Sequence, residues 1–185
     1  TKNIKHYYKS ASKTNQLASN YIKKLYVDES NILWIGTNEG LSRMDLEYGI
    51  LTSHYINVKD KNAPGDTTEY SISAITKASE NKLWLGTRSG LVRLNTENYS
   101  YEFFPHHLSV FRFGWGEITE IISNKKGALW LATPAELMRF NTNTLTYESI
   151  KNDPLNTESL SYNSITSIII DRTQIVWVGT SGMGI

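Results

Sequence analysis

The chain has 185 residues, of which 39% are hydrophobic and 11% aromatic, as expected for a folded domain with its own core. Its 19 Lys and Arg nearly balance its 18 Asp and Glu, so it lacks the basic excess of a nucleic-acid-binding surface. The absence of cysteine excludes disulfides and thiolate metal sites. No apolar run approaches the length of a membrane helix, and the N-terminus lacks the layout of a signal peptide.

Four segments of the chain align on a tryptophan, at spacings of 50, 46 and 47 residues. Self-similarity at this period predicts a repeat architecture. In each segment an apolar pair precedes a string of the type Leu-Trp-Ile-Gly-Thr. The four strings are Leu33–Thr37, Leu83–Thr87, Leu129–Thr133 and Val176–Thr180.

Each repeat contains short β-rich runs separated by turn residues, and no helical periodicity. In the first repeat the runs cover roughly 21–27, 32–37, 41–45 and 50–58. Four antiparallel strands at this period predict a β-propeller blade, in which stacked sheets bury both faces of each other. The tryptophans are accordingly assigned to the structural repeat core. They are Trp34, Trp84, Trp130 and Trp177.

The predicted strands do not complete a ring. The fold class is all-β, a propeller fragment of about 3.75 four-stranded antiparallel blades. Residues 4–8 are predicted to form the last strand of a preceding blade, so about fifteen strands are expected. The predicted units are 1–17 (the end of a preceding blade), 18–58, 68–104, 117–150 and 161–185 (half of a further blade). We expect the bare edges to be covered by remaining blades or by a second copy of the chain, giving a homo-oligomer in which residues 4–8 complete the blade begun at 165–185.

The repeat closely resembles the two-component regulator propeller repeat. The resemblance is carried by Leu160–Ile168, Asp171 and Val176–Thr180, and again by Ile22–Asp45. Three positions depart from it: Ala78 replaces an Asp or Asn, Ala132 replaces a Gly, and Glu136 replaces the turn glycine. These departures suggest specialised surfaces on the second and third blades.

Such repeats are typical of the periplasmic sensor region of bacterial hybrid two-component systems, many of which sense oligosaccharides and control polysaccharide-utilisation genes. The resemblance therefore implies a periplasmic ligand-sensing segment that is not itself an enzyme, in a parent protein that is a histidine kinase and that alone contacts the membrane. A structural scaffold with the ligand bound elsewhere, and a propeller lyase or hydrolase, are the alternatives.

The least repetitive stretch is the connection 105–117, which contains aromatic and planar polar side chains suited to sugars. Connections of this kind and the turns between second and third strands emerge on the same face of a propeller. An alternative is that the connection packs its aromatic side chains against itself or a neighbouring domain. The candidate ligand-binding residues are His107, Arg112, Trp115, Arg88, Asn38 and Glu39.

Three arginines recur two residues before an acid or amide, as in Arg43 and Asp45. They could form a ring of anion-binding groups, but recurrence in every complete repeat favours a structural role. No metal site is expected, because His106 and His107 are adjacent and no third ligand is evident. No cofactor, nucleotide-binding motif or catalytic residue is predicted either.

Overall fold

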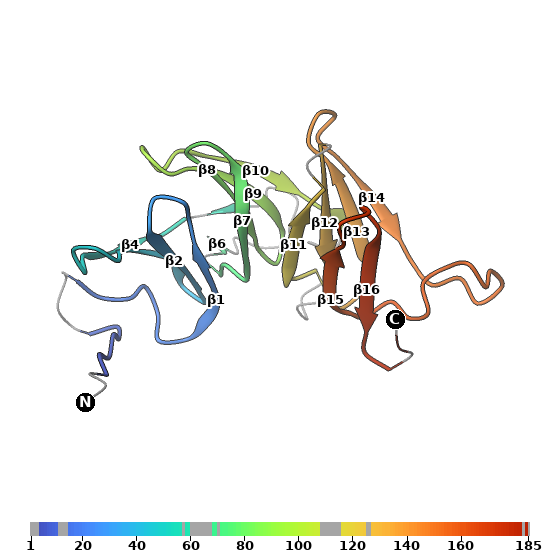
Figure 1. The fold of residues 1–185 in the computed structure, drawn as a ribbon, viewed down its shortest axis with the longest axis horizontal. Helices are drawn as coiled ribbons and strands as arrows, with labels where there is room; N and C mark the ends of the chain where they lie inside the picture. Colours follow the sequence, from blue (N-terminus) through green and yellow to red (C-terminus); the bar gives the residue numbers. More distant parts are fainter. Residues whose placement is uncertain are drawn as a thin grey trace.

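The computed structural model describes residues 4–10, 15–56, 58–59, 68–69, 71–107, 116–124, 127–182 and 184. Its secondary structure is all β, and its antiparallel sheets follow one another side by side in an open arc (Figure 1). Three sheets have four strands each and are called blades 1, 2 and 3. A fourth sheet has two strands and is called the half-blade.

Within each blade the strands are hydrogen-bonded in chain order. The first strand of each blade is its inner strand, and the inner strands of consecutive blades are neighbours. Blade 1 consists of β1 (Ile22–Val27), β2 (Ile32–Thr37), β3 (Gly40–Asp45) and β4 (Leu51–His54). Blade 2 consists of β7 (Ala74–Ser79), β8 (Lys82–Gly86), β9 (Gly90–Asn95) and β10 (Tyr101–Pro105). Blade 3 consists of β11 (Glu120–Ser123), β12 (Ala128–Ala132), β13 (Leu137–Asn141) and β14 (Thr146–Ile150), and the half-blade of β15 (Ile165–Ile170) and β16 (Val176–Thr180).

The predicted fold class is confirmed, with two differences in the strands. Residues 4–10 form no strand, so the strand predicted at 4–8 was wrong. These residues instead lie beside blade 1, where Tyr7 packs against a buried cluster. A short hairpin of β5 (Val58–Lys59) and β6 (Thr68–Glu69), which the sequence did not predict, lies between blades 1 and 2.

The turn after each inner strand places one residue at positive φ, in the left-handed region. The residue is Asn31, Asn81 or Gly127 in blades 1 to 3, and Gln174 in the half-blade. Asn and Gly adopt this conformation readily, whereas Gln does not. Gln174 nevertheless has a φ of 71°, so the architecture of the turn overrides the preference of the residue.

An aspartate in this turn fixes the repeat tryptophan. Asp28 accepts the backbone N–H of Ile32 at 3.0 Å through one oxygen and the indole N–H of Trp34 at 2.7 Å through the other. Asp171 accepts the indole N–H of Trp177 at 2.8 Å in the same way. Bonds of this kind to a carboxylate are stronger than neutral ones. The hydrogen bonds from Thr173 and Trp177 lower the pKa of Asp171 to about 2.

Blades 2 and 3 lack this carboxylate. Ala78 packs against the cluster around Trp84, whose ring is approached by the guanidinium of Arg93 at 5.5 Å. In blade 3, Asn124 accepts the backbone N–H of Ala128 at 3.0 Å, but the buried indole N–H of Trp130 has no hydrogen-bond partner among the residues that the structure describes.

Alternate side chains of each second strand face opposite neighbours, as the period of a β-strand requires. In blade 1, Trp34 packs with residues of blade 2, whereas Leu33 and Ile35 pack on the other face. The pattern recurs at Trp84 and Leu85 in blade 2. One tryptophan per blade therefore fills the space before the following blade.

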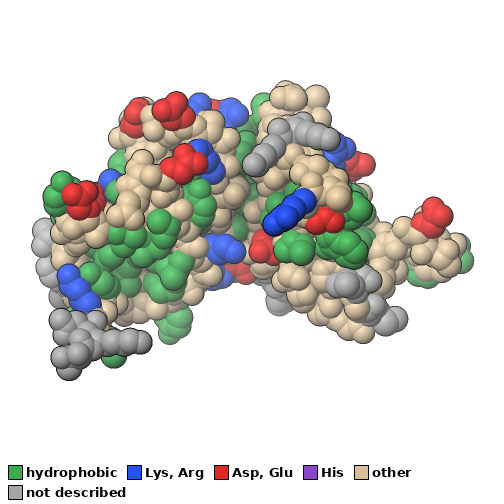
Figure 2. Space-filling model, viewed as in Figure 1, with side chains coloured by type: hydrophobic (Ala, Val, Ile, Leu, Met, Phe, Trp, Pro, Cys, Tyr) green, Lys and Arg blue, Asp and Glu red, His purple; other side chains and the backbone are tan. Residues whose placement is uncertain are grey.

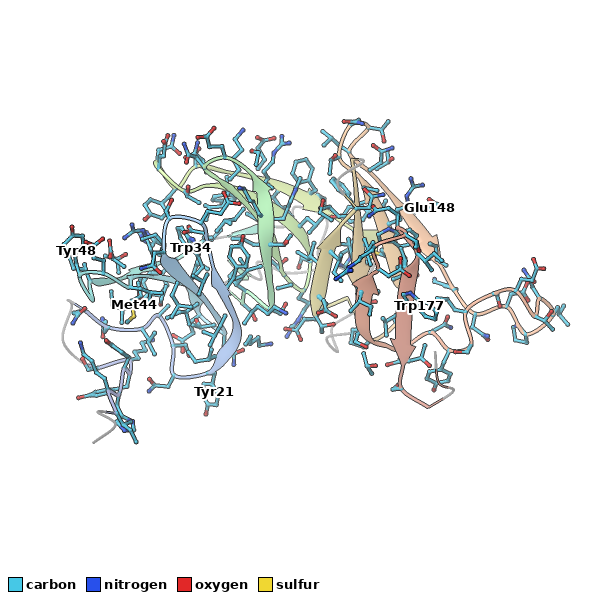
Figure 3. The ribbon with its side chains drawn as sticks, viewed as in Figure 1. Tyr21, Trp34, Met44, Tyr48, Glu148 and Trp177 are labelled. Atoms are coloured by element: carbon cyan, nitrogen blue, oxygen red, sulfur yellow. The ribbon has the colours of Figure 1, made fainter. Side chains whose placement is uncertain are left out.

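The burial of the four tryptophans differs along the arc. Trp34 and Trp84 are buried and Trp130 is nearly so, as expected for the repeat core. Trp177 is 46% exposed, which differs from that expectation, because no described residue of this chain forms a blade beyond it (Figure 3).

One backbone hydrogen bond joins each blade to the next. The amide of Ile72, Ile118 or Ile165 donates to the carbonyl of Thr37, Thr87 or Thr133 of the preceding blade, at 2.9, 3.0 and 3.1 Å. This requires the backbones to approach closely. A Cβ added to Gly36 would lie 2.5 Å from the Ile72 carbonyl oxygen, and one added to Gly86 would lie 2.8 Å from that of Ile118.

We expect Gly36→Ala to destabilise the fold by about 2 kcal/mol, because the methyl group would push blade 2 away from blade 1. Urea unfolding monitored by tryptophan fluorescence measures the effect. Ala132→Gly is the matched control, because the third junction already accommodates a methyl group. Removing that methyl group loses the free energy of its burial, which is about 1 kcal/mol at most. A Gly36→Ala variant as stable as the parent would show that the close approach is not required.

We expect Asn124→Asp to stabilise the fold by about 1 kcal/mol at neutral pH, because the new carboxylate oxygen accepts the unpartnered indole N–H of Trp130. The converse change, Asp28→Asn, should lose a similar amount. Both are measured by the midpoint of urea unfolding. A gain from Asn124→Asp that persists after Trp130→Phe would contradict the explanation, because that variant has no indole N–H.

Candidate functional site

The turns that carry three of the candidate residues share one geometry. In blade 1 the hydroxyl of Thr37 donates to the carbonyl of Gly40 at 2.9 Å, and in blade 2 Thr87 donates to Gly90 at 2.8 Å. The connections between blades also begin and end at this end of the sheets. Asn38 and Glu39 lie in the first turn and Arg88 in the second, and all three are exposed.

Within the first turn, Glu39 is held by its own part of the chain. The ammonium of Lys9 donates to Glu39 Oε2 at 2.5 Å, and this bond lowers the pKa of the carboxyl group. The amide of Asn38 donates to the carbonyl of Tyr21 at 3.1 Å. Both residues are thus in contact with the segment that leads into blade 1.

Two candidates, Arg112 and Trp115, lie outside the described residues, whereas His107 is described. The structure places His107 beside Glu136, which the sequence analysis noted only as a departure from the repeat.

Glu136 occupies the place of Gly40 and Gly90 in the turn of blade 3, and its side chain is 0% exposed. The turn still closes, with Thr133 donating to the Glu136 carbonyl at 2.7 Å.

The Glu136 carboxylate contacts three side chains. Ser149 donates to Oε2 at 2.5 Å, and the Lys151 ammonium lies 2.9 Å from the same oxygen. His107 Nε2 lies 2.9 Å from Oε1, in a contact that is ionic when His107 is protonated rather than a well-aligned hydrogen bond. A buried carboxylate requires such compensation. Glu136 therefore holds the connection that enters blade 3, through His107, and the one that leaves it, through Lys151.

His106 anchors the same connection to blade 2. Its side chain is buried, its ring Nε2 lies 2.8 Å from the Gly116 carbonyl, and its amide donates to the Ser89 carbonyl at 3.1 Å. Burial lowers the pKa of His106 because it disfavours the charged form. A neutral ring that donates from Nε2 to Gly116 satisfies this environment.

Tyr147 completes the packing beneath this anchor. Its hydroxyl donates to the Phe104 carbonyl at 2.6 Å and accepts the Leu91 amide at 3.1 Å, and its ring lies edge-on to that of His106. Burial raises the pKa of Tyr147, so the phenol is neutral. The connection therefore starts on a rigid support.

The other end of the connection is held near the inner strands. Glu117 pairs with Lys23 of blade 1, although blade 2 lies between them in the sequence. Glu120 lies 4.0 Å from Lys24 and accepts the amide of Ile168 of the half-blade at 2.9 Å. Polar contacts hold both ends of the 105–117 connection, His107 against Glu136 at one end and the Glu117–Lys23 ion pair at the other.

Two of the three recurring arginines have carboxylate partners within their blades. Arg93 donates to Glu102 at 2.6 Å and Arg139 to Glu148 at 3.3 Å, each across the register of adjacent strands. Asn95 and its equivalents accept backbone amides of the following turn. The arrangement agrees with the structural interpretation of these residues.

Sequence reasoning missed the residues that surround His107. Glu136 was detectable as a charged residue at a glycine position, but nothing in the sequence indicated that Ser149 and Lys151 would meet it. The pairing of Lys23 with Glu117 was also not predicted, because it depends on the curvature of the arc.

Two hollows among the described residues lie elsewhere. One runs along β4 and the turn before it, and the other lies between blades 1 and 2 near Tyr26 and Lys77. No group of three His, Cys, Asp or Glu side chains in this part of the chain is placed to hold a metal ion. The described residues also include no helix long and apolar enough to cross a bilayer.

The family model of the two component regulator propeller matches residues 16–39 and 159–182, which lie in the first and last repeats. This confirms the resemblance that the repeats indicated. No curated protein sequence matches the chain.

Solved structures with the same fold include two extracellular domains described as parts of putative hybrid two component systems of B. thetaiotaomicron. BT4673 has a TM-score of 0.70 at 19% identity, over 88% of this chain and 20% of that one. BT3049 has a TM-score of 0.61 at 22% identity, over 96% and 28%. Virginiamycin B lyase from Staphylococcus aureus has a TM-score of 0.59 at 14% identity, over 85% and 48%. The chain thus spans about a fifth to a half of the length of these propellers.

We expect the stability of the fold to fall as the pH drops below about 6.5. One reason is that protonation would place a charge on His106, whose pKa is lowered by its burial. Because the pKa of His106 is lower in the folded state, acidification protonates this residue in the unfolded state before it does so in the folded state. The free energy of unfolding therefore falls as the pH drops. Urea unfolding at pH 7.5 and 5.5 should show a smaller acid loss for His106→Gln than for the parent. His54→Gln serves as a comparison, because burial lowers the pKa of that histidine too. An unchanged acid loss in His106→Gln would contradict the assignment.

Proposed function

We propose that this chain of two component regulator propeller repeats is a ligand-sensing segment of the extracytoplasmic part of a hybrid two-component regulator. The family match and the fold shared with extracellular domains of such systems support this role and location. The periplasm is the compartment that we propose, and the ligand class is an oligosaccharide whose presence controls polysaccharide-utilisation genes.

The observation that carries the proposal is the break in repeat symmetry at blade 3. Ligand sites usually break the symmetry of a repeat, and Glu136 is a buried carboxylate where two other blades have glycine. It holds His107 and Lys151, whose side chains are 49% and 50% exposed, beside the 105–117 connection. Polar groups of this kind suit sugar hydroxyls, and the aromatic residues in the sequence of the connection are of the type that suits C–H faces.

The arrangement also suggests how binding is transmitted. Glu136 contacts the connection before blade 3 and the connection after it, so a ligand that shifts His107 alters the environment of Lys151. The ligand transmits a signal only if it binds one arrangement of these connections more tightly than the other. Arg88 of the preceding turn, with Arg112 and Trp115 of the connection, completes the proposed contact set, and Asn38 and Glu39 extend it towards blade 1.

We expect a panel of soluble neutral and uronate oligosaccharides to contain at least one that binds saturably without being cleaved. Isothermal titration measures binding, and a reducing-end assay on the same samples detects cleavage. New reducing ends would favour a propeller lyase or hydrolase, and neither binding nor cleavage would favour a scaffold; either result would contradict the proposal.

For the bound sugar, His107→Ala should weaken affinity by about tenfold, through loss of one contact to a charged or polar group. Glu148→Gln is the control, because that carboxylate pairs with Arg139 on the outer strands. Equal affinity in the His107 variant and the parent would remove His107 from the site.

A further inference from the structure

The exposed side chains around Glu136 are basic. Lys151 and His107 contact its carboxylate at 2.9 Å and are half-exposed. Arg88, in the corresponding turn of blade 2, is exposed as well, and the carbonyl of the next residue accepts the amide of His106 at 3.1 Å. Ammonium and guanidinium groups donate hydrogen bonds but accept none, and the same holds for a protonated imidazole.

The acid among these residues is hidden from any ligand. The Glu136 carboxylate is 0% exposed, with one oxygen accepting the Ser149 hydroxyl and contacting Lys151, and with the other oxygen facing His107. It therefore holds the bases in place without offering an acceptor at the surface. An ammonium carries three N–H groups, so Lys151 can contact Glu136 and a ligand at the same time.

Other acceptor side chains near the two turns point inward or are already used. Thr87, Ser89 and Thr133 are buried, and the two threonine hydroxyls donate to carbonyls of their own turns at 2.8 and 2.7 Å. Residues 105–116 of the connection include no Asp or Glu in their sequence. The next acid along the chain, Asp153, accepts a backbone amide of its own turn at 3.0 Å. The side chains available to a ligand here are therefore mainly donors.

The opposite end of blade 2 has a different arrangement of charge. There Lys77 pairs with Glu29 at 2.6 Å, and Glu80 and Lys82 line the same hollow. The Glu29 side chain is 81% exposed, so acids and bases reach the solvent together. Figure 2 shows side chains of both charges next to one another over blade 2 at this end. The excess of exposed bases is thus local to the site, in a chain whose net charge is only +1.

We propose that the site around Glu136 is selective for acidic oligosaccharides, and that Lys151 binds the carboxylate or sulfate group of the ligand. This inference rests on the proposed sensing function and specifies the class of ligand for the same site. Carboxylate and sulfate oxygens are acceptors only, so they complement a surface of donors, whereas the hydroxyl of a neutral sugar both donates and accepts. His107 and Arg88 supply further donors beside Lys151.

Isothermal titration can compare each acidic oligosaccharide with its neutral counterpart, a uronate with its methyl ester and a sulfated chain with its desulfated form. The acidic member should bind roughly tenfold or more tightly, because it makes charge-assisted hydrogen bonds that the neutral member cannot make. The advantage should shrink as the salt concentration rises from about 0.05 M to about 0.5 M, since salt screens exposed charges. The series that shows the advantage identifies the anion as carboxylate or sulfate.

Lys151→Met should weaken binding of the acidic member by about tenfold and leave the affinity for the neutral member unchanged. Lys151→Arg should keep the preference, because the charge and the donors remain. Lys77→Met is the matched control, because Lys77 is 46% exposed and also pairs with a glutamate, but lies at the opposite end of the sheets. Melting curves show whether each variant is folded. If Lys151→Met does not fold because Glu136 loses a partner, Arg88→Gln tests the same preference.

The outcomes separate the selectivity from the sensing function. Neutral members that bind as tightly as acidic ones, or equal losses in Lys151→Met and Lys77→Met, would overturn the selectivity and leave the sensing function in place. Absence of binding to every oligosaccharide would overturn both. A loss for acidic members that is confined to the Lys151 or Arg88 variant is the expected result.

Discussion

The close approach of consecutive blades is the constraint on which the rest of the structure depends. The amide of one inner strand donates to a threonine carbonyl of the preceding blade, and this bond recurs at three junctions with nearly the same length. It places an isoleucine carbonyl of the following blade where a Cβ of Gly36 or Gly86 would lie. A larger residue at either position would therefore displace the backbone of the following blade. The tryptophan two residues earlier then fills the space between the sheets.

The features that repeat could be predicted from the sequence, because each pattern occurs in several copies that can be compared with one another. The tryptophan strings placed the second strands, and the Asn and Gly positions placed the turns. The burial of Trp177 could not be inferred in the same way, because it depends on what lies beyond the half-blade. Residues 4–8 have the composition of a strand, but they pack Tyr7 on blade 1 without pairing to any edge.

A location for the candidate site was proposed from the sequence, but the contacts that the structure shows there were not predicted. The sequence pointed to the 105–117 connection and to His107, because this stretch does not repeat. It did not place Lys151 or Ser149 beside Glu136, since the register of their strands had to be known first. It also missed the contact of Glu117 with Lys23, which joins segments far apart along the chain. Charged side chains that break a repeat are therefore informative even when their partners are not yet known.

The spacing within each repeat has a consequence for how such a chain can diversify. From the isoleucine that begins a blade to its tryptophan there are always 12 residues, as from Ile22 to Trp34 or from Ile165 to Trp177. A single inserted residue in that interval would exchange the two faces of the second strand and bury the wrong side chains. Length differences accumulate instead between one tryptophan and the next isoleucine, which is 38, 34 and 35 residues along the chain. Evolution can thus remodel the connections that emerge at one end of every sheet. The strands and the turns at the opposite end of the sheets keep a constant length.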